Sequence, residues 1–536
     1  MNDEKFQLKE KIENNETVQK GKRGILRLLF SRTALLILLL LLQIAFIVSG
    51  YVYLAGKWYF VDGIVTLLSF ILVVFIMNGR DNPAFKLVWI IVILALPIFG
   101  TPLYLFVEFQ LGSKWTNSRL QKMHQYSQKY WSQDQEVLAN LEKEDPKMAR
   151  LVNYVNRYGG FPVYQNTEVT YFASGEEKFE RLQEELKKAK HFIFMEYFIV
   201  AKGYMWDTIL EILKAKVKEG VEVRFMYDGM NSLSTLPYKY PEQLEAYGIR
   251  CHVFAPIRPA LSTQQNNRDH RKIVVVDGRV AFTGGINLAD EYINRKERFG
   301  HWKDTAIMVE GDAVRSFTLM FLEMWNVHKD ISRKPIQPFD KYLDVAQERT
   351  PTEEDGFVIP YGDSPLDHEI VGEQVYIDIL YTAENYVHIM TPYLILGNEM
   401  ILALTYAAKR GVDVKIIMPH IPDKWYAFVL AKTYYDELLD AGVEIYEYIP
   451  GFVHAKSFTS DDEKAVVGTI NLDFRSLYLH FECAALFYKN KEVAKVEDDF
   501  QATLGKCVKV TREDFSSQPL FNRLAGHVLR LLAPLM

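Results

Sequence analysis

One eight-residue pattern occurs twice in this chain, and its duplication constrains the fold more than any other feature. Residues 270–277 read HRKIVVVD and residues 454–461 read HAKSFTSD, so both copies are H-x-K-x4-D. Seventeen positions after each histidine comes an asparagine, Asn287 in the first copy and Asn471 in the second. Upstream, GVEVRFM at 220–226 corresponds to GVDVKII at 411–417. The chain therefore contains one structural unit twice.

Each unit alternates short apolar runs with charged segments of helical length. Strands that alternate with helices indicate parallel βαβ units. We expect an α/β fold in which residues 161–340 and 341–510 form two pseudo-symmetric halves, packed face to face, with a polar linker at 332–356 between them. The 536 residues are sufficient for two such domains.

Three apolar runs precede the repeats, at residues 33–54, 59–77 and 87–107. A helix of about 20 apolar residues can cross the hydrocarbon core of a bilayer, so we expect residues 33–110 to be a multi-pass transmembrane region. The polar segment 1–32 turns basic before the first run, which predicts a cytoplasmic N-terminus. The third run is broken by Pro97, Gly100 and Pro102. It either spans or re-enters, so the side that the second part of the chain faces stays open.

Two further segments are amphipathic. Residues 111–160 form a connector that either lies near the lipid headgroups or packs as a solvated helix on the next domain. The tail, residues 511–536, is apolar and basic by turns and either lies on a bilayer or caps the core.

Charge and cysteine content exclude some classes of function. With 68 acidic and 62 basic residues the net charge is −6, which disfavours a protein that holds nucleic acid by broad phosphate neutralisation. The three cysteines, Cys251, Cys483 and Cys507, are widely spaced and make no C-x-x-C pair. They are expected to be small core residues, not disulfides or metal ligands.

The repeated motif has the parts that phosphodiester transfer needs. Alternate residues of a strand face the same way, so His270 is expected to project with Lys272, and His454 with Lys456. If the halves face each other, one imidazole attacks phosphorus to form a phosphohistidine. The other protonates the departing alkoxide and then takes a proton from the incoming alcohol or water.

The remaining polar groups have supporting roles in this scheme. The two lysines and the amides of Asn287 and Asn471 are expected to hold the non-bridging oxygens. The scheme requires neither a metal ion nor another cofactor.

Carboxylates are expected to fix the tautomer of each histidine. Glu482 lies twenty-eight residues after His454, and Asp304 lies thirty-four residues after His270, with a six-residue insertion around 291–300. We take both as histidine-orienting residues. Asp277 and Asp461 complete the motifs but fall at hairpin turns, where Asp is favoured for backbone reasons. A structural role is therefore favoured over direct chemistry for these two.

These motifs resemble those of the phospholipase D superfamily, and the order of apolar segments followed by two H-x-K-x4-D motifs is similar to that of bacterial cardiolipin synthases. The blocks that carry the resemblance are residues 97–105 (PIFGTPLYL), 284–292 (GGINLADEY) and 468–477 (GTINLDFRSL), and it covers roughly 58–536. The departure is the additional apolar segment 33–54, which puts the topology in doubt.

The resemblance implies a function and a location. A phosphatidyl group would pass from one phosphatidylglycerol to another, giving cardiolipin and glycerol, in a bacterial cell membrane. It also implies six catalytic motif residues: His270, Lys272, Asp277, His454, Lys456 and Asp461. By analogy His270 is the nucleophile and His454 the acid/base, although the near-symmetry of the motifs leaves either assignment open.

Three alternatives share these sequence features. A phospholipase D-type hydrolase would use the same residues with water as acceptor. A non-catalytic protein that binds anionic lipids would not need two imidazoles. A membrane-bound nuclease is disfavoured by the negative net charge.

Overall fold

The structure is a computed structural model, and it separates into two units. It describes residues 41, 44–45, 49, 58–79, 82–108, 111–230, 234–255, 267–327, 336, 338–343, 356–367, 369–516 and 518–535. One unit contains the N-terminal residues to Lys114, and the second contains 115–256 and 266–536. Segment 1–32, most of the predicted run 33–54 and most of the linker 332–356 lie outside the described residues.

Three apolar helices form the described part of the N-terminal unit: α3 (Trp58–Asn78), α4 (Pro83–Ala95) and α5 (Pro97–Glu108). Their contacts bury Leu72, Ile76, Ile93 and Tyr104 in one small cluster. The third predicted run is thus two helices, because Pro97 has no N–H to continue α4 past Leu96. Among the helices that the structure describes, none combines the length and the apolar character that crossing a bilayer demands.

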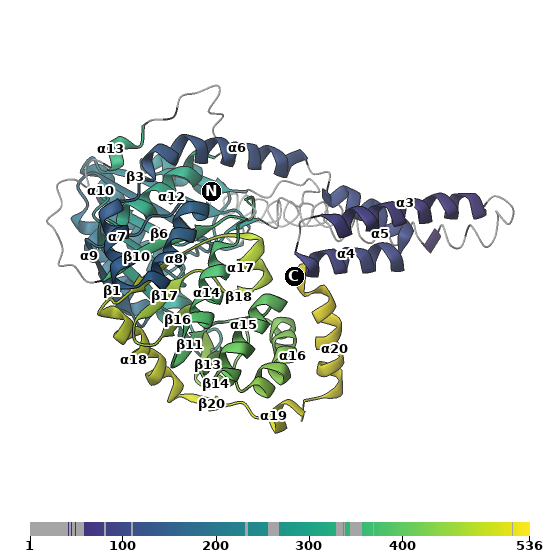
Figure 1. Cartoon of the computed structure of the whole chain (residues 1–536). Coiled ribbons are helices and arrows are strands. Elements are labelled where there is room, and N and C mark those ends of the chain that lie inside the picture. The colour runs from purple at the N-terminus through teal and green to yellow at the C-terminus, as the bar shows by residue number, and fades with distance from the viewer. Residues whose placement is uncertain are drawn as a thin grey trace, which may run out of the picture. The chain divides into compact units, whose positions relative to one another are not determined.

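The first half of the second unit is built on a seven-stranded sheet, with the helices shown in Figure 1. In spatial order its strands are β1 (Thr167–Phe172), β9 (Ala306–Gly311), β7 (Val280–Gly284), β6 (Ile273–Val276), β2 (Phe192–Tyr197), β3 (Glu222–Asp228) and β4 (Arg250–Phe254). Its main helices are α9 (Gly175–Lys188), α10 (Tyr204–Lys218), α11 (Tyr240–Ala246) and α12 (Val314–Asn326).

The second half repeats this arrangement with one more strand at its far edge. The spatial order is β10 (Phe357–Asp363), β19 (His480–Tyr488), β17 (Lys464–Gly468), β16 (Ser457–Ser460), β11 (Tyr386–Met390), β13 (Asp413–Pro419), β14 (Glu444–Tyr448) and β20 (Cys507–Lys509). Its helices are α14 (Val371–Thr382), α15 (Asn398–Lys409), α16 (Trp425–Ala441), α17 (Phe474–Tyr478), α18 (Glu492–Leu504), α19 (Arg512–Ser516) and α20 (Leu520–Leu532).

The expectation of parallel strands holds for only part of each sheet. Strands β2, β3 and β4 run parallel, as do β11, β13 and β14. The strands that follow the motifs are antiparallel to their neighbours: β6 to β2 and β7, and β16 to β11 and β17. The short turns at Asp277 and Asp461 account for the β6–β7 and β16–β17 pairs, because a hairpin can join only antiparallel strands.

The two halves pack against each other, as predicted. One continuous core cluster contains Val275 and Val309 of the first sheet together with Val467 and Phe487 of the second. Helix α12 contributes Phe317 and its neighbours to the same cluster. Because the two sheets share one apolar interior, each half has a fixed position relative to the other. The loops at the equivalent edges of the two halves therefore come together.

From residue 115 on, the connector 111–160 is part of the second unit and packs within it. It consists of α6 (Leu111–Ser127), α7 (Gln135–Glu144), α8 (Pro146–Tyr154) and short turns, not one continuous helix. The Tyr130 hydroxyl donates to Asp340 at 2.9 Å, and the Trp131 indole donates to Glu323 at 2.7 Å. The sequence allowed two interpretations of this segment, contact with lipid headgroups or packing on the next domain. The structure shows the packing.

Candidate active site

Each motif begins in a loop that pairs with the other half of the protein. A two-residue strand β5 (Arg268–Asp269) runs parallel to the start of β19, and the His270 amide donates to Phe481 O at 2.9 Å. In the same way β15 (Gly451–Val453) runs parallel to β8 (His301–Lys303), and the His454 amide donates to Lys303 O at 2.7 Å. The motif histidine of each half is thus held against a strand of the other half, β19, which contains Glu482, or β8, which ends one residue before Asp304.

The two histidines are consequently paired with carboxylates across the halves. Nδ1 of His270 lies 2.8 and 2.9 Å from the two carboxylate oxygens of Glu482. Nδ1 of His454 lies 2.7 Å from Oδ2 of Asp304. Both acids are fully buried, and both histidines are less than a tenth exposed. With Nδ1 occupied, Nε2 of each ring is the nitrogen that a substrate can meet.

The motif lysines lie beside their histidines, but not on a strand as the sequence suggested. Residues 270–272 and 454–456 are extended loop segments that precede β6 and β16. Lys272 donates through Nζ to the carbonyl oxygen of His270, and Lys456 does the same to His454. Both lysine side chains are buried.

The charges of the two halves act within one site. Burial, the charge of Lys456 and that of Lys272 lower the pKa of His454 to about 4. Burial also lowers the pKa of His270 well below its usual value, against the opposing effect of Glu482. For Lys456 burial lowers the pKa to about 7, with attraction to Asp304 opposing it and the charge of Lys272 adding to it. For Lys272 burial lowers the pKa to about 8.

The carboxylates remain charged in spite of their burial. Although burial raises their pKa values, His454 lowers that of Asp304, and His270 lowers that of Glu482, below the ordinary range. At neutral pH the site therefore holds two anionic carboxylates, two neutral imidazoles and two lysines close to their titration range. Such a site favours a phosphodiester anion, because its negative charge restores full protonation of the lysines.

The two asparagines occupy equivalent positions with partly satisfied amides. Asn287 accepts from the Ile199 amide at 2.9 Å and donates to the Tyr292 hydroxyl at 2.9 Å. Asn471 donates to Ser476 Oγ at 3.0 Å, while its own Oδ1 is buried without a protein partner. Each amide nitrogen has a second hydrogen, so one donor per asparagine remains for a phosphate oxygen.

The aspartates that end the motifs lie at the opposite end of the motif strands. Asp277 accepts from the amides of Lys190, His191 and Phe192 at 2.7–2.8 Å. Asp461 accepts from the amides of residues 384–386 at 2.8–3.0 Å. Both have positive φ, 53° and 55°, in the hairpin turns. They tie the hairpins to the start of β2 and β11, which matches the structural role favoured by the sequence.

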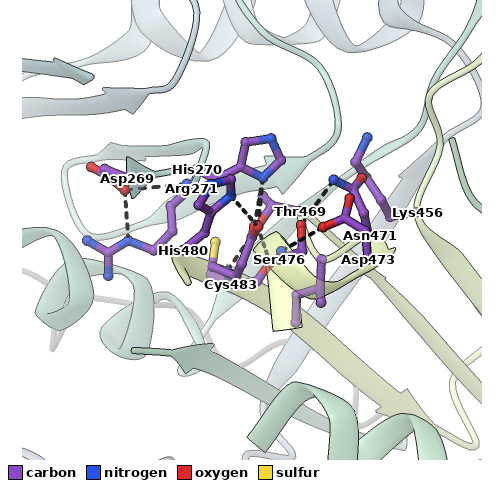
Figure 2. A network of polar contacts seen from close by, with 12 residues as sticks. Asp269, His270, Arg271, Lys456, Thr469, Asn471, Asp473, Ser476, His480 and Cys483 are labelled. Carbon is purple, nitrogen blue, oxygen red and sulfur yellow. Dashed lines mark hydrogen bonds and ion pairs between the residues drawn. The ribbon is translucent and has the colours of Figure 1, made fainter. Parts of the chain in front are cut away.

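His480 joins the site without having been singled out in the sequence. Its ring centroid lies 5.4 Å from that of His270, and its Nδ1 is 3.6 Å from Glu482. Figure 2 shows the His270 and His480 side chains next to each other, near Thr469. Trp302 takes the matching place beside His454, at 5.3 Å between ring centroids. The repeat held a signal for both, since each stands two residues before its orienting acid.

His270, His480 and Glu482 also form a set that could hold a metal ion. All three are buried, and their ligand atoms lie within 4.8 Å of one another. A cation there would have to replace the hydrogen bond between Nδ1 of His270 and Glu482. The three residues therefore belong to the polar network of the site, and Figure 2 labels the two histidines.

Gly285 in the first half and Thr469 in the second half occupy the same position of the repeat. A Cβ at Gly285 would lie 2.0 Å from Oδ1 of Asp304 and 2.9 Å from the carbonyl oxygen of His454. At the equivalent position Thr469 donates from its hydroxyl to Glu482 and accepts from the Cys483 amide at 3.0 Å. The two acids are thus held differently, although the histidines that they orient are equivalent.

Comparison with known proteins shows which family the chain belongs to. A family described as "Cardiolipin synthase, PLD-like domain" matches residues 182–325 and 376–504, and one described as phospholipase D-nuclease N-terminal matches 65–108. An uncharacterized protein of Streptococcus mutans is 53% identical over 87% of this chain and 99% of its own length. A cardiolipin synthase of Alkalihalophilus pseudofirmus is 34% identical over 88% of this chain and 93% of its own.

Among solved structures, the phosphatidylserine synthase of Haemophilus influenzae has the same fold. It aligns with a TM-score of 0.55 and 17% identity, over 73% of this chain and 98% of its own. The two repeated halves and the paired H-x-K motifs define a protein of the phospholipase D superfamily. Within that superfamily the chain belongs to the cardiolipin synthase family, and it is a phosphatidyltransferase.

Proposed function

We propose that this enzyme is a cardiolipin synthase that uses phosphatidylglycerol as both donor and acceptor. The observation that carries the proposal is the pair of crossed contacts, His270 with Glu482 and His454 with Asp304. They leave Nε2 of each ring for substrate in a buried site that also contains Lys272 and Lys456. One histidine can then attack phosphorus while the other exchanges a proton with the alcohol.

In the first step Nε2 of His270 forms a bond to phosphorus of one phosphatidylglycerol. The bond from phosphorus to the glycerol oxygen breaks. His454, which takes up a proton from solvent when the phosphodiester anion binds beside it, gives that proton to the oxygen, so glycerol leaves. In the second step His454 takes the proton from a hydroxyl of another phosphatidylglycerol. That oxygen attacks the phosphohistidine, which releases cardiolipin and restores His270.

The lysines and asparagines stabilise the charge that develops on phosphorus. The donors are the ammonium groups of Lys272 and Lys456 and the side-chain amides of Asn287 and Asn471. No metal ion or nucleotide takes part in the scheme. Glu482 and Asp304 keep the imidazoles in the required tautomer and stabilise the imidazolium that forms in turn.

A lipid acceptor also accounts for the apolar N-terminal region. We place the enzyme at a bacterial cell membrane, anchored through residues 33–110. Helices α3 and α4 expose side chains such as Phe70, Phe75 and Leu94, each more than half accessible. Such exposure is rare in water-soluble domains and favours contact with acyl chains.

Product analysis tests the proposal. The purified, detergent-solubilised enzyme is given phosphatidylglycerol alone, and cardiolipin, phosphatidic acid and glycerol are followed. We expect cardiolipin with one glycerol released per turnover, and no turnover in His270→Ala or His454→Ala. Phosphatidic acid without cardiolipin would make the enzyme a hydrolase, and substantial activity in either histidine variant would refute the two-histidine mechanism.

A matched control separates loss of chemistry from loss of structure. His420 is also paired with a carboxylate, Glu447, at 2.9 Å, but its side chain is half exposed. It lies in the loop between β13 and α16 and belongs to neither motif. His420→Ala is expected to retain most activity.

A further inference from the structure

Helix α20 is docked on the protein by one side only. Gly526 is buried, and a Cβ there would meet Thr433 Cγ2 of α16 at 2.7 Å. Arg530 donates to the Thr433 carbonyl at 3.1 Å, and its guanidinium lies 4.4 Å from the centre of the Tyr434 ring. Helices α16 and α20 run next to each other in Figure 1. The orientation of α20 about its own axis is therefore set by close packing.

The other side of α20 is apolar and exposed. Six side chains have exposed fractions between 42% and 79%: Leu520, Phe521, Leu524, Val528, Leu531 and Leu532. The surface continues onto the start of α16, where Trp425 and Tyr426 are 51% and 42% exposed and the Trp425 ring stacks with Phe521 at 6.3 Å. We call these eight residues the α20 patch. Contiguous apolar patches of this kind usually mark a binding surface.

The charges of α20 indicate what covers the patch. The helix contains Arg523, His527 and Arg530 but no acidic residue, although acidic residues outnumber basic ones in the whole chain. Arg523 and His527 are exposed along one edge of the apolar strip. An amphipathic helix with a basic edge, extended by Trp and Tyr, has the composition of helices that lie in the surface of an anionic bilayer.

The patch also lies close to the candidate active site. The Tyr393 hydroxyl donates at 2.7 Å to Asp423, two residues before Trp425. A small hollow is lined by Tyr393, Lys424 and Phe452 among others, and the Phe452 ring is 6.0 Å from that of His454. At its other end α20 leads into a turn that lies against α17, which carries Ser476, the partner of Asn471.

We propose that the α20 patch docks on the surface of a bilayer that contains anionic phospholipid. Docking there brings the headgroup layer to the mouth of the site, so that lipid is transferred without leaving the membrane. The role of the patch in catalysis rests on the proposed function, whereas its contact with the bilayer does not. A second copy of the chain is the competing occupant of the same apolar surface.

Depth measurement tests the contact directly. Full-length protein with Leu524→Cys in a Cys507→Ser background is labelled with an environment-sensitive fluorophore, since Cys251 and Cys483 are buried. It is reconstituted in phosphatidylglycerol vesicles with brominated acyl chains. We expect strong quenching at position 524 and little at Tyr247→Cys, a control on the first half that is 47% exposed. Absent quenching at 524, or equal quenching at both positions, would overturn the proposal.

A paired assay tests the consequence for turnover. Leu524→Glu with Val528→Glu is compared with wild type on phosphatidylglycerol in vesicles and on a short-chain, water-dispersed phosphatidylglycerol. We expect turnover on vesicles to fall by about tenfold or more, because two charges now face the acyl region, and turnover of the short-chain lipid to stay unchanged. The control variant Tyr247→Glu should retain both activities.

The outcomes separate this proposal from the proposed function. If wild type does not turn over the short-chain lipid, the proposed function fails, while the quenching result still decides the contact. Unchanged turnover on vesicles in the double variant would refute docking. If light scattering in detergent shows wild type at twice the mass of the double variant, the patch is covered by a second copy, which also overturns the proposal.

Discussion

Glu482, which belongs to the second half, holds Nδ1 of His270 in the first half at 2.8 Å. Asp304 of the first half does the same for His454 of the second. Neither half therefore supplies both the motif histidine and the carboxylate that binds its Nδ1. The reason is the pairing of β5 with β19 and of β15 with β8, which carries each motif loop across the interface.

The crossed pairing predicts that an acid substituted in one half disables the histidine of the other. In Glu482→Gln and Asp304→Asn the neutral amide no longer stabilises an imidazolium, so turnover should fall by about 10²–10⁴-fold. A substrate whose leaving group needs no protonation, such as a p-nitrophenyl phosphatidyl ester, separates the two steps. With it, Asp304→Asn should still release p-nitrophenol in a first burst, whereas Glu482→Gln should not.

The reverse result would exchange the roles of the histidines. A burst in Glu482→Gln that is lost in Asp304→Asn would make His454 the nucleophile. If both variants keep near wild-type turnover, the carboxylates do not orient the histidines. Thr469→Ser keeps the hydroxyl that donates to Glu482 and is the conservative control for the Glu482 site.

The lysine and histidine pKa values predict the pH dependence of kcat/KM. The nucleophile must be neutral, and because burial lowers the pKa of His270 well below 6.5, activity should persist below that pH. The phosphate-binding lysines must be charged, and their pKa values of about 7 and about 8 place the loss of activity on the alkaline side, as pH rises through this interval. A rate that rises steadily from pH 6 to pH 9 would contradict this assignment.

Lys456→Arg tests which group causes the alkaline loss. A guanidinium stays charged throughout this range, so any remaining kcat/KM should decline at a higher pH than in wild type. The kcat profile of wild type should also decline later than kcat/KM, because the bound phosphodiester anion favours the charged lysines. Identical profiles in wild type and Lys456→Arg would assign the loss to another group.

Gly285→Ala should impair catalysis more than folding. The added Cβ would meet Oδ1 of Asp304 at 2.0 Å, so the carboxylate must move from His454 or the loop must shift. We expect kcat to fall by about tenfold to a hundredfold, since small displacements of a positioned group are costly, with a modest change in the thermal unfolding midpoint. A variant with wild-type kcat would show that the loop accommodates the methyl group without moving Asp304.

Asp277→Ala should affect stability, not chemistry. It leaves three backbone amides at the start of β2 without their acceptor, which should lower the free energy of unfolding by about 2–3 kcal/mol. Asp462→Ala is the matched control, because this exposed aspartate accepts from the Tyr386 hydroxyl and should change stability little. Thermal unfolding and turnover at a temperature where both variants are folded distinguish the effects. Loss of turnover in folded Asp277→Ala would give that aspartate a part in the reaction.

Much of the site was predictable because the repeat supplies an internal comparison. The two copies of H-x-K and the asparagines at equal spacing identified His270, His454, Asn287 and Asn471. The structure brings the histidines and lysines into one buried, charge-coupled site. Asp277 and Asp461 could be recognised as turn residues because Asp at a hairpin is a local preference of the backbone.

Other features could not be obtained from periodicity. Strand β6 is antiparallel to β2, and β16 is antiparallel to β11. These directions depend on how the strands assemble into a sheet, which the periodicity of apolar residues does not encode. His480 and Trp302 are ordinary strand residues until the partner loop places a motif histidine beside each. The sequence left open whether the amphipathic tail lies on a bilayer or caps the core. The packing of Gly526 on α16 determines which side of α20 is exposed.

By itself the sequence determined the duplication, the α/β class and the residues that can do the chemistry, because repeats, periodicity and residue types are properties of local order. Only the tertiary structure decided that Glu482 serves His270 and Asp304 serves His454. Each acid is joined to its histidine by an interface between the halves, 212 and 150 residues apart in the chain. This interface is held together by the burial of apolar surface, which is non-directional. It therefore leaves no sequence motif that would show which acid pairs with which histidine.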